Sequence, residues 1–187
     1  MDQRAARVTV VVVAPPGRVD ALVDALACDD IDVVGTTDAA GAVPGIAEGA
    51  PDIVVAVAGA DELAATASVV ATAAATRIVA IGSAEPGELI AGGVGAVVDT
   101  DASPDELVAA VLGLALGEAR LDHGLASFII DRVDNGEGLE PLSATEREVL
   151  TQLAAGEDVH TLADSYAVSP RMVRLISGGV LARVLEA

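Results

Sequence analysis

Two hydrophobic periodicities alternate along residues 8–117. Short runs rich in valine and isoleucine are typical of strands buried on both faces, and the longer alanine-rich stretches between them have helical spacing. The expected strands cover residues 8–14, 31–35, 53–57, 77–81 and 96–98. The expected helices cover residues 18–27, 39–49, 61–74, 85–91 and 103–116.

Strands that alternate with helices in this way predict a parallel sheet covered by helices on both faces. Five such units favour an α/β fold of the flavodoxin-like (βα)5 order. The start of the last helix supports this pattern, because Ser103 is a suitable N-cap and Pro104 suits the first helical position. Asp105 and Glu106 follow, where acidic side chains interact favourably with the helix dipole.

Residues 118–140 are predicted to link this sheet to a second unit. Apolar residues continue there at helical spacing, at Leu121, Leu125, Phe128, Ile129 and Val133. The sequence Asp-Asn-Gly-Glu-Gly at residues 134–138 then breaks regular structure. We therefore expect a linker helix followed by a flexible hinge.

Residues 141–187 show three short helical patterns, which predict a small all-α unit. In the first, Ser143 or Thr145 is the expected N-cap, Thr145 and Glu148 resemble a capping box, and Gly156 ends the helix. Its apolar positions are Val149, Leu150, Leu153 and Ala154. In the second, the residues expected on one face are Leu162, Ala163 and Tyr166.

The third helix is expected to start after a tight turn at Ala167 and Val168, with Ser169 as N-cap and Pro170 at its first position. Its expected buried stripe is Val173, Ile176, Val180, Leu181 and Val184. In that arrangement the side chains expected to face outward are those of Arg171, Met172, Arg174, Leu175 and Ser177. In a helix-turn-helix such a face enters the major groove of DNA, but small three-helix units also bind proteins, and periodicity alone does not separate the two.

The residues of this unit resemble the LuxR-type DNA-binding domain. The matching positions are Leu142, Ser143, Glu146, Glu148, Val149, Leu150, Ala154, Gly156, Leu162, Ala163, Val168, Ser169, Val173 and Arg174. The resemblance implies double-stranded DNA as partner and a DNA-binding set of Ser169, Arg171, Met172, Arg174 and Ser177.

The unit also departs from the LuxR-type pattern. Asp158, Val159 and His160 replace a small polar pair and a basic residue, so fewer phosphate contacts are expected. Ile176 stands where histidine is common, and glycines 178 and 179 each weaken a helix by about 1 kcal/mol relative to alanine. The family's usual fourth helix, which often carries the dimer contact, has no counterpart before Ala187. We expect weak DNA binding, or dimerisation through the first domain.

Three short sequence segments of the first unit resemble the receiver domain of NarL/FixJ-type response regulators. They are residues 51–55 (PDIVV), 92–98 (GGVGAVV) and 102–107 (ASPDEL). With the C-terminal unit, the resemblance spans nearly the whole chain. It implies a receiver-like domain at residues 1–117, the linker helix and hinge at 118–140, and a LuxR-type helix-turn-helix domain at 141–187.

A receiver of this family needs acidic residues after its first strand, a phosphoacceptor aspartate after the third, a hydroxyl after the fourth and a lysine after the fifth. This chain has Ala14-Pro15-Pro16 after the first strand, and the phosphoacceptor position falls on Ala56. The hydroxyl and lysine positions fall on Gly82 and Asp99. The resemblance therefore implies an atypical receiver that is not phosphorylated.

The net charge of −19 argues at first sight against a nucleic-acid partner, because DNA affinity comes largely from neutralised phosphates. Residues 1–140, however, hold 23 of the 29 acidic residues and 6 of the 10 basic ones, whereas residues 141–187 hold 6 and 4. Residues 165–185 include Arg171, Arg174 and Arg183 and no acidic residue. The third helix is thus a local positive strip on an acidic protein.

Several functional classes find no support in the residues. Cys28 is the only cysteine, and His123 and His160 are the only histidines, so no metal-ligand cluster is expected. We find no phosphate-binding glycine loop and no Ser/His/Asp set, and we predict neither an enzyme nor a cofactor. No signal sequence or membrane-spanning apolar run is visible, which predicts a cytoplasmic protein.

Together these observations predict a DNA-binding transcriptional regulator, an atypical response regulator that acts without aspartyl phosphorylation. It would act as a homodimer or as a heterodimer with a related regulator. The alternative is a protein–protein interaction module that has lost DNA binding, and the overall negative charge favours that alternative.

Overall fold

The structure is a computed structural model that describes residues 7–38, 40–57, 77–82, 84–136 and 140–186. The strands are β1 (Val8–Val13), β2 (Ile31–Thr37), β3 (Ile53–Val57), β4 (Arg77–Ile81) and β5 (Val94–Val98). The helices are α1 (Pro16–Ala25), α2 (Ala42–Gly49), α4 (Pro86–Ala91), α5 (Pro104–Ala115), α6 (His123–Asp134), α7 (Ala144–Ala154), α8 (Val159–Ser165) and α9 (Pro170–Glu186). The expected helix at residues 61–74 lies outside the described residues.

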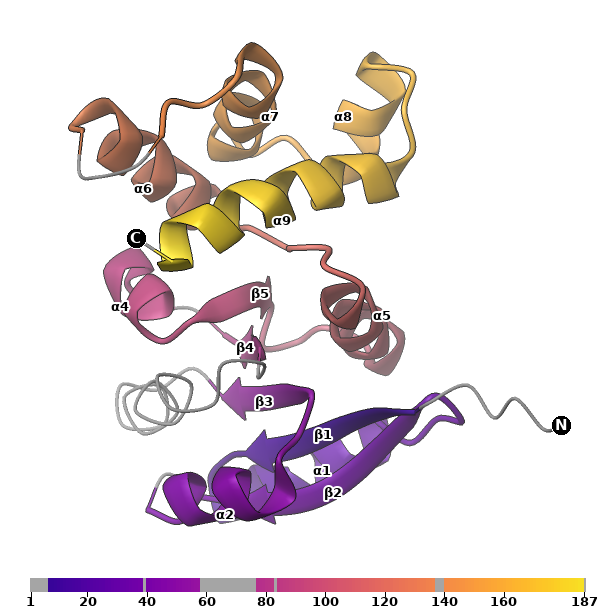
Figure 1. Cartoon of the computed structure of the whole chain (residues 1–187). Helices are drawn as coiled ribbons and strands as arrows, with labels where there is room; N and C mark the ends of the chain where they lie inside the picture. Colours follow the sequence, from indigo (N-terminus) through magenta and orange to yellow (C-terminus); the bar gives the residue numbers. More distant parts are fainter. Residues whose placement is uncertain (1–6, 39, 58–76, 83, 137–139, 187) are drawn as a thin grey trace, which may run out of the picture.

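The strands form a parallel sheet in the order β2-β1-β3-β4-β5, which confirms the predicted flavodoxin-like fold (Figure 1). Alternate residues of β1 point to opposite faces, as the pleat requires: Val10 and Val12 pack with α1 and α5, and Val11 and Val13 pack with α2 and α4. All four valines are almost fully buried, which explains why the strand has no polar alternation.

The observed boundaries differ from the expected ones mostly at proline and glycine. The helix expected from residue 18 begins at Pro16, because a proline at the first helical position loses no hydrogen bond. The strand expected from residue 96 begins at Val94, directly after Gly93, whose φ of 71° lets the chain turn sharply out of α4. Strands β3 and β4 have the predicted limits.

The caps of the C-terminal helices show two corrections. The capping box of α7 joins Ser143 to Glu146 rather than Thr145 to Glu148, because the helix begins at Ala144 and places Thr145 inside its first turn. Tyr166 does not share the buried face of α8. It is the C-cap residue, 41% exposed, and its hydroxyl donates to the Glu148 carboxylate at 3.0 Å.

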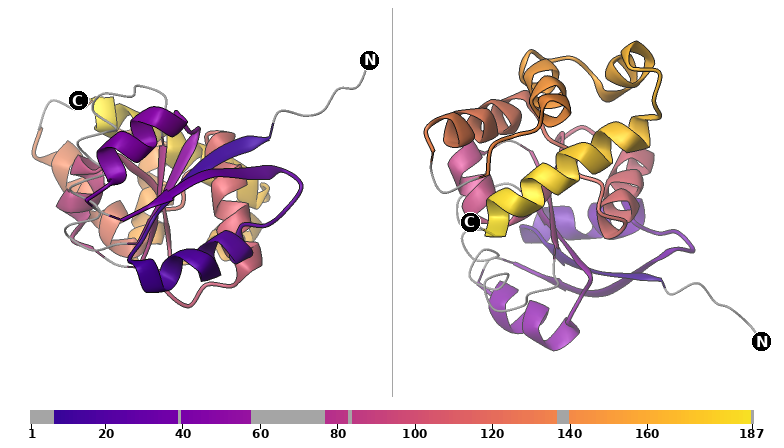
Figure 2. Two further views of the ribbon diagram at one scale, coloured as in Figure 1. Left: turned by 90° about the horizontal axis from the view of Figure 1, so that it is seen from below. Right: turned by 45° about the horizontal axis from the view of Figure 1, so that its top comes forward.

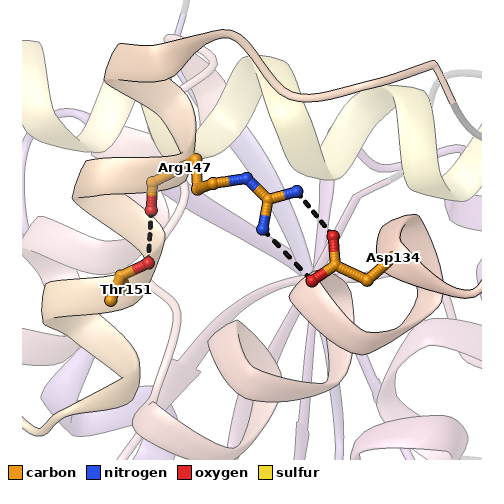
Figure 3. A network of polar contacts seen from close by, with 3 residues as sticks. All are labelled: Asp134, Arg147 and Thr151. Carbon is orange, nitrogen blue, oxygen red and sulfur yellow. Dashed lines mark hydrogen bonds and ion pairs between the residues drawn. The ribbon is translucent and has the colours of Figure 1, made fainter.

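Helix α6 packs against α4 on the sheet side and α7 on the other side (Figure 1). Its N-cap Asp122 accepts a hydrogen bond from the Leu125 amide at 2.7 Å, as the helix start requires. At its other end Asp134 receives two hydrogen bonds from the Arg147 guanidinium of α7, at 2.5 and 3.2 Å (Figure 3). Thr151 lies one turn after Arg147 in α7, and its hydroxyl donates to the Arg147 carbonyl.

One apolar cluster extends from the sheet into the C-terminal helices. It contains Ile78 and Leu89 of the sheet unit, Ile129 of α6, Leu150 of α7 and Val180 of α9, all nearly fully buried. Two views show α9 lying between the β5 edge of the sheet and helices α7 and α8 (Figures 1 and 2). The division into residues 1–117, 118–140 and 141–187 stays a prediction, and residues 137–139 of the expected hinge lie outside the described ranges. Within those ranges, no helix is long and apolar enough to cross a membrane.

Candidate nucleic-acid interface

Helices α8 and α9 form a helix-turn-helix. Ala167 adopts a left-handed conformation with φ of 51°, and the Val168 amide donates to the Ala163 carbonyl at 2.9 Å, which closes the turn. Ser169 then caps α9 by accepting a hydrogen bond from the Met172 amide at 3.3 Å, with Pro170 at the first helical position. Leu162, Ala163 and Val173 bury the inner faces of the two helices together with α7.

The buried stripe of α9 differs from the expected one at a single position. Ser177 is 2% exposed and lies in the stripe, whereas Ile176 is only half-buried. The prediction that Ser177 faces outward is therefore wrong. From Val173 the positions nearest the core follow at i+4, i+7, i+8 and i+11, which selects Ser177 over Ile176. The serine is tolerated there because its hydroxyl donates to the Val173 carbonyl at 3.0 Å.

The other predicted contact residues lie at the N-terminal end of α9 and outside its buried stripe. Ser169 is exposed, and Met172 is 47% exposed. Arg171 and Arg174 both extend toward one carboxylate, that of Glu118. Nε of Arg171 lies 3.0 Å from Oε1 of Glu118, and the Arg174 guanidinium lies 3.7 Å from Oε2. The structure thus brings together four of the five predicted residues. Two of them, Arg171 and Arg174, form ion pairs with Glu118.

Glu118 belongs to residues 117–120, between α5 and α6, which we call the covering segment. This segment continues the sheet edge, because Arg120 forms a parallel bridge with Ala96 and its carbonyl accepts from the Val97 amide at 2.9 Å. On its other side the Ala119 amide donates to the Arg174 carbonyl of α9 at 3.1 Å. The face of α9 that carries Arg171 and Arg174 is therefore joined to the sheet by backbone as well as by side-chain contacts.

A glycine makes this close approach possible. A Cβ atom added at Gly178 would lie 2.2 Å from the Gly117 carbonyl oxygen and 3.2 Å from the Ala119 nitrogen. No side chain fits at that distance, so the two backbones touch only because residue 178 is glycine. A Cβ added at the neighbouring Gly179 would meet nothing within 4 Å.

Positive charge is concentrated around Glu118. The pKa of the Arg120 guanidinium is lowered first by burial and then by the positive charge of Arg174, with Glu106 and Glu118 opposing that shift. Glu118 itself is 8% exposed. The nearly buried Glu118 carboxylate pairs with Arg171 and Arg174, and an unpaired carboxylate would be costly at that depth.

Sequence reasoning placed Glu118 in the linker and gave it no role. Its partners lie more than fifty positions later in the chain, so no local pattern connects them. The usable signal was Gly178, because a glycine inside a predicted helix can mark a position where another backbone packs closely.

At the carboxyl edge of the sheet, the ends of β1 and β3 carry alanine side chains. Ala14 and Ala56 are fully buried, and the register places Val13 beside Ala56 and Ala56 beside Ala80. Gly82 has φ of 105°, and Asp99 is exposed. In the described part of the chain no three His, Cys, Asp or Glu side chains are grouped so that they could hold a metal ion.

The fold and this surface define a class of architecture, a parallel sheet of flavodoxin-like order joined to a helix-turn-helix. No protein-family model and no curated protein matches the chain. Among solved structures, the response regulator RcsB in a complex with DNA is 17% identical with a TM-score of 0.54, over 96% of this chain and 92% of that chain.

Two further response regulators are similar, one over nearly the whole chain and one over about two thirds of it. ChrA, from a heme-sensing two-component system, is 22% identical with a TM-score of 0.53, over 95% of this chain and 90% of that chain. A LuxR-family two-component response regulator from Aurantimonas sp. SI85-9A1 is 22% identical with a TM-score of 0.55, over 69% of this chain and 99% of that chain. At these identities the similarity establishes the shared fold.

Proposed function

We propose that this protein is a DNA-binding transcriptional regulator and that α9 is its recognition helix. The observation that carries the proposal is the α8–α9 helix-turn-helix, whose Arg171 and Arg174 share one face. The fold similarity to RcsB, one of whose structures is a complex with DNA, supports the same assignment. The partner is double-stranded DNA.

Each residue at the start of α9 has a role in this proposal. The guanidinium groups of Arg171 and Arg174 suit phosphate oxygens or the O6 and N7 atoms of guanine. The Met172 side chain suits an apolar contact such as a thymine methyl group, and Ser169 places its hydroxyl and the helix N-terminus toward a phosphate. Ser177, buried against the core, has no part in the interface.

We further propose that regulation does not use aspartyl phosphorylation. Ala14 and Ala56 occupy the positions where the resemblance requires acidic side chains, and both are fully buried. Incubation with acetyl phosphate and Mg²⁺ is expected to leave the intact mass unchanged. A stoichiometric gain of one phosphoryl group, about 80 Da, would contradict this proposal.

The regulator would act in the cytoplasm as a homodimer or as a heterodimer with a related regulator. A dimer doubles the number of recognition helices on one duplex and so offsets the small number of phosphate contacts from each. Sedimentation of the protein alone and with a duplex distinguishes a dimer that preexists from one that forms on DNA.

Titration of the protein into genomic fragments, its own upstream region included, tests the function. We expect sequence-selective binding that Arg174→Ala weakens by about 1–3 kcal/mol and that Arg18→Ala, which removes the same charge from α1, leaves unchanged. Absence of selective binding by the folded protein would instead favour the interaction module that has lost DNA binding.

A further inference from the structure

We infer that a cavity within the C-terminal unit binds a small primary amine, whose ammonium group carries an apolar body. The cavity has a volume of about 320 Å³ and is lined by α7, the α8–α9 turn and α9. Ligand pockets in proteins measure about 300–1,000 Å³, so this one suits a small ligand. The inference goes beyond the proposed function, because the residues that line the cavity are not those assigned to DNA.

The first argument is the apolar lining. Val149 of α7 and Val173 of α9 line the cavity and are nearly fully buried. Val168 and Tyr166 also line it, but they are 39% and 41% exposed. The position of Val168 is fixed, because its amide donates to the Ala163 carbonyl at 2.9 Å. A ligand with an apolar body would remove the exposed Val168 and Tyr166 surfaces from water, which favours binding.

The second argument is charge. The Glu148 carboxylate lines the cavity and accepts hydrogen bonds from the Tyr166 hydroxyl at 3.0 Å and from the Gln152 amide at 3.5 Å. Within the described ranges, no basic side chain forms an ion pair with Glu148. Its negative charge is therefore available to a ligand. A carboxylate next to an aromatic ring is a combination that attracts an ammonium ion, through a charge-assisted hydrogen bond and a cation–π contact.

The third argument is the number of acceptors. The polar side chains that line the cavity are those of Thr145, Glu148 and Tyr166, and each of them carries oxygen. Thr145 and Glu148 lie three positions apart on α7, so their side chains are neighbours on one face of the helix. A primary ammonium has three N–H donors, which match these oxygens. An anionic ligand would instead be repelled by Glu148, and an alcohol would leave the carboxylate charge without a counter-charge.

Titration of the full chain with hexylamine tests the inference. Tyr166 is the only tyrosine and the chain has no tryptophan, so intrinsic fluorescence reports on this cavity. A carboxylate that accepts the phenol proton quenches tyrosine emission, so an ammonium group that takes over Glu148 should raise the emission until the site is saturated. We expect a Kd of about 0.1–1 mM for a ligand of about seven heavy atoms. Hexan-1-ol and hexanoate should bind at least about tenfold more weakly.

Glu148→Gln and Glu157→Gln form a matched pair for the charge. Each variant removes one negative charge from an exposed position, but only Glu148 lines the cavity, whereas Glu157 lies in the loop between α7 and α8. We expect Glu148→Gln to weaken hexylamine binding by about tenfold, as measured by calorimetry. Glu157→Gln should change the affinity by less than about twofold, because general attraction between an acidic protein and a cation is screened by salt.

Val168→Ser and Leu116→Ser form a second pair, for the apolar lining. Both variants shorten an exposed apolar side chain, but Leu116 follows α5 and does not line the cavity. Val168→Ser should weaken the binding of hexylamine and of hexan-1-ol by about threefold each, because less apolar surface is buried. Leu116→Ser should leave both affinities unchanged.

The outcomes decide this inference separately from the proposed function. Saturable binding of hexylamine that Glu148→Gln weakens and Glu157→Gln does not would support the amine site. A titration that does not saturate, hexanoate bound as tightly as hexylamine, or equal affinities of the two glutamine variants would overturn it. These measurements use no DNA, so the regulator proposal can fail while the amine site stands, and the reverse.

Discussion

The carboxyl edge of the sheet and the arginine-bearing face of α9 contrast in chemistry. At the sheet edge, Ala14 and Ala56 are buried and apolar. At the face of α9, Arg171 and Arg174 are polar, partly exposed and paired with Glu118. The first region buries methyl groups at these two positions, whereas the second has charged groups paired with a neighbouring segment.

The contrast indicates which region responds to a signal under the proposed function. Under that proposal, Ala14 and Ala56 contribute packing to the sheet and no acidic side chain. The covering segment joins the two regions, because it pairs with β5 on one side and with α9 on the other. A change in how the segment packs on β5 would thus reach α9 directly, without a phosphoryl group.

The largest expected effect comes from placing an acid at the buried edge. Ala56→Asp puts a carboxylate at a fully buried position without a cationic partner, and should lower the free energy of unfolding by about 3–5 kcal/mol. Asp99→Lys, an exposed control on the same edge, should stay within about 0.5 kcal/mol. Urea unfolding measures both, and equal stability of Ala56→Asp and the unmodified protein would show that the edge is open to water.

Removing one arginine from α9 should have the next largest effect. Arg174→Ala should weaken DNA binding by about 1–3 kcal/mol and make the salt dependence of the binding constant shallower by about one unit, since one phosphate contact is lost. Binding isotherms at several salt concentrations give both quantities. A slope that does not change would mean that Arg174 contacts no phosphate.

A smaller effect is expected at the helix caps. Ser143 and Ser103 make the same capping box, on α7 and α5 respectively. Each serine-to-alanine change should cost about 1 kcal/mol in unfolding free energy. Only Ser143→Ala should also weaken DNA binding, because α7 packs beneath the helix-turn-helix. Equal effects of the two variants on DNA affinity would remove the distinction between the two regions.

The smallest effect concerns pH. Hydrogen bonds from the Thr161 hydroxyl, and from the Thr161 and His160 amides, lower the pKa of Asp158, the N-cap of α8. Its folded pKa lies below its unfolded value of about 3.9, so its stabilising contribution is present above pH 4 and is lost as pH falls through the folded pKa. Asp158→Asn should flatten this part of the stability profile between about pH 4 and 2. An unchanged profile would mean that Asp158 does not titrate with unfolding.

The sequence predicted the elements better than their mutual contacts. Strands β3 and β4 were placed at their observed limits because an apolar run bounded by polar residues marks a buried strand directly. The start of α9 was also predicted, because Ser169 and Pro170 form a local signal. These features depend on neighbouring residues only.

The errors arose where the outcome depends on packing. Packing against neighbouring helices fixes the rotation of α9 about its axis, and this rotation places Ser177 on the buried side. The buried Ser177 hydroxyl donates a hydrogen bond to the Val173 carbonyl of the same helix. The pairing of Glu118 with Arg171 and Arg174 joins residues far apart in sequence, and it follows from how α9 lies on the sheet edge. No periodicity in the chain encodes that arrangement.

Amide hydrogen exchange at Ala119, with and without a saturating duplex chosen by the genomic titration, tests the central claim most directly. The Ala119 amide donates to the Arg174 carbonyl in this structure. If α9 binds DNA through Arg171 and Arg174, the covering segment must leave this face, and exchange at Ala119 should accelerate by tenfold or more on DNA binding. An Ala119 amide that remains equally protected in the DNA-bound protein would contradict the account.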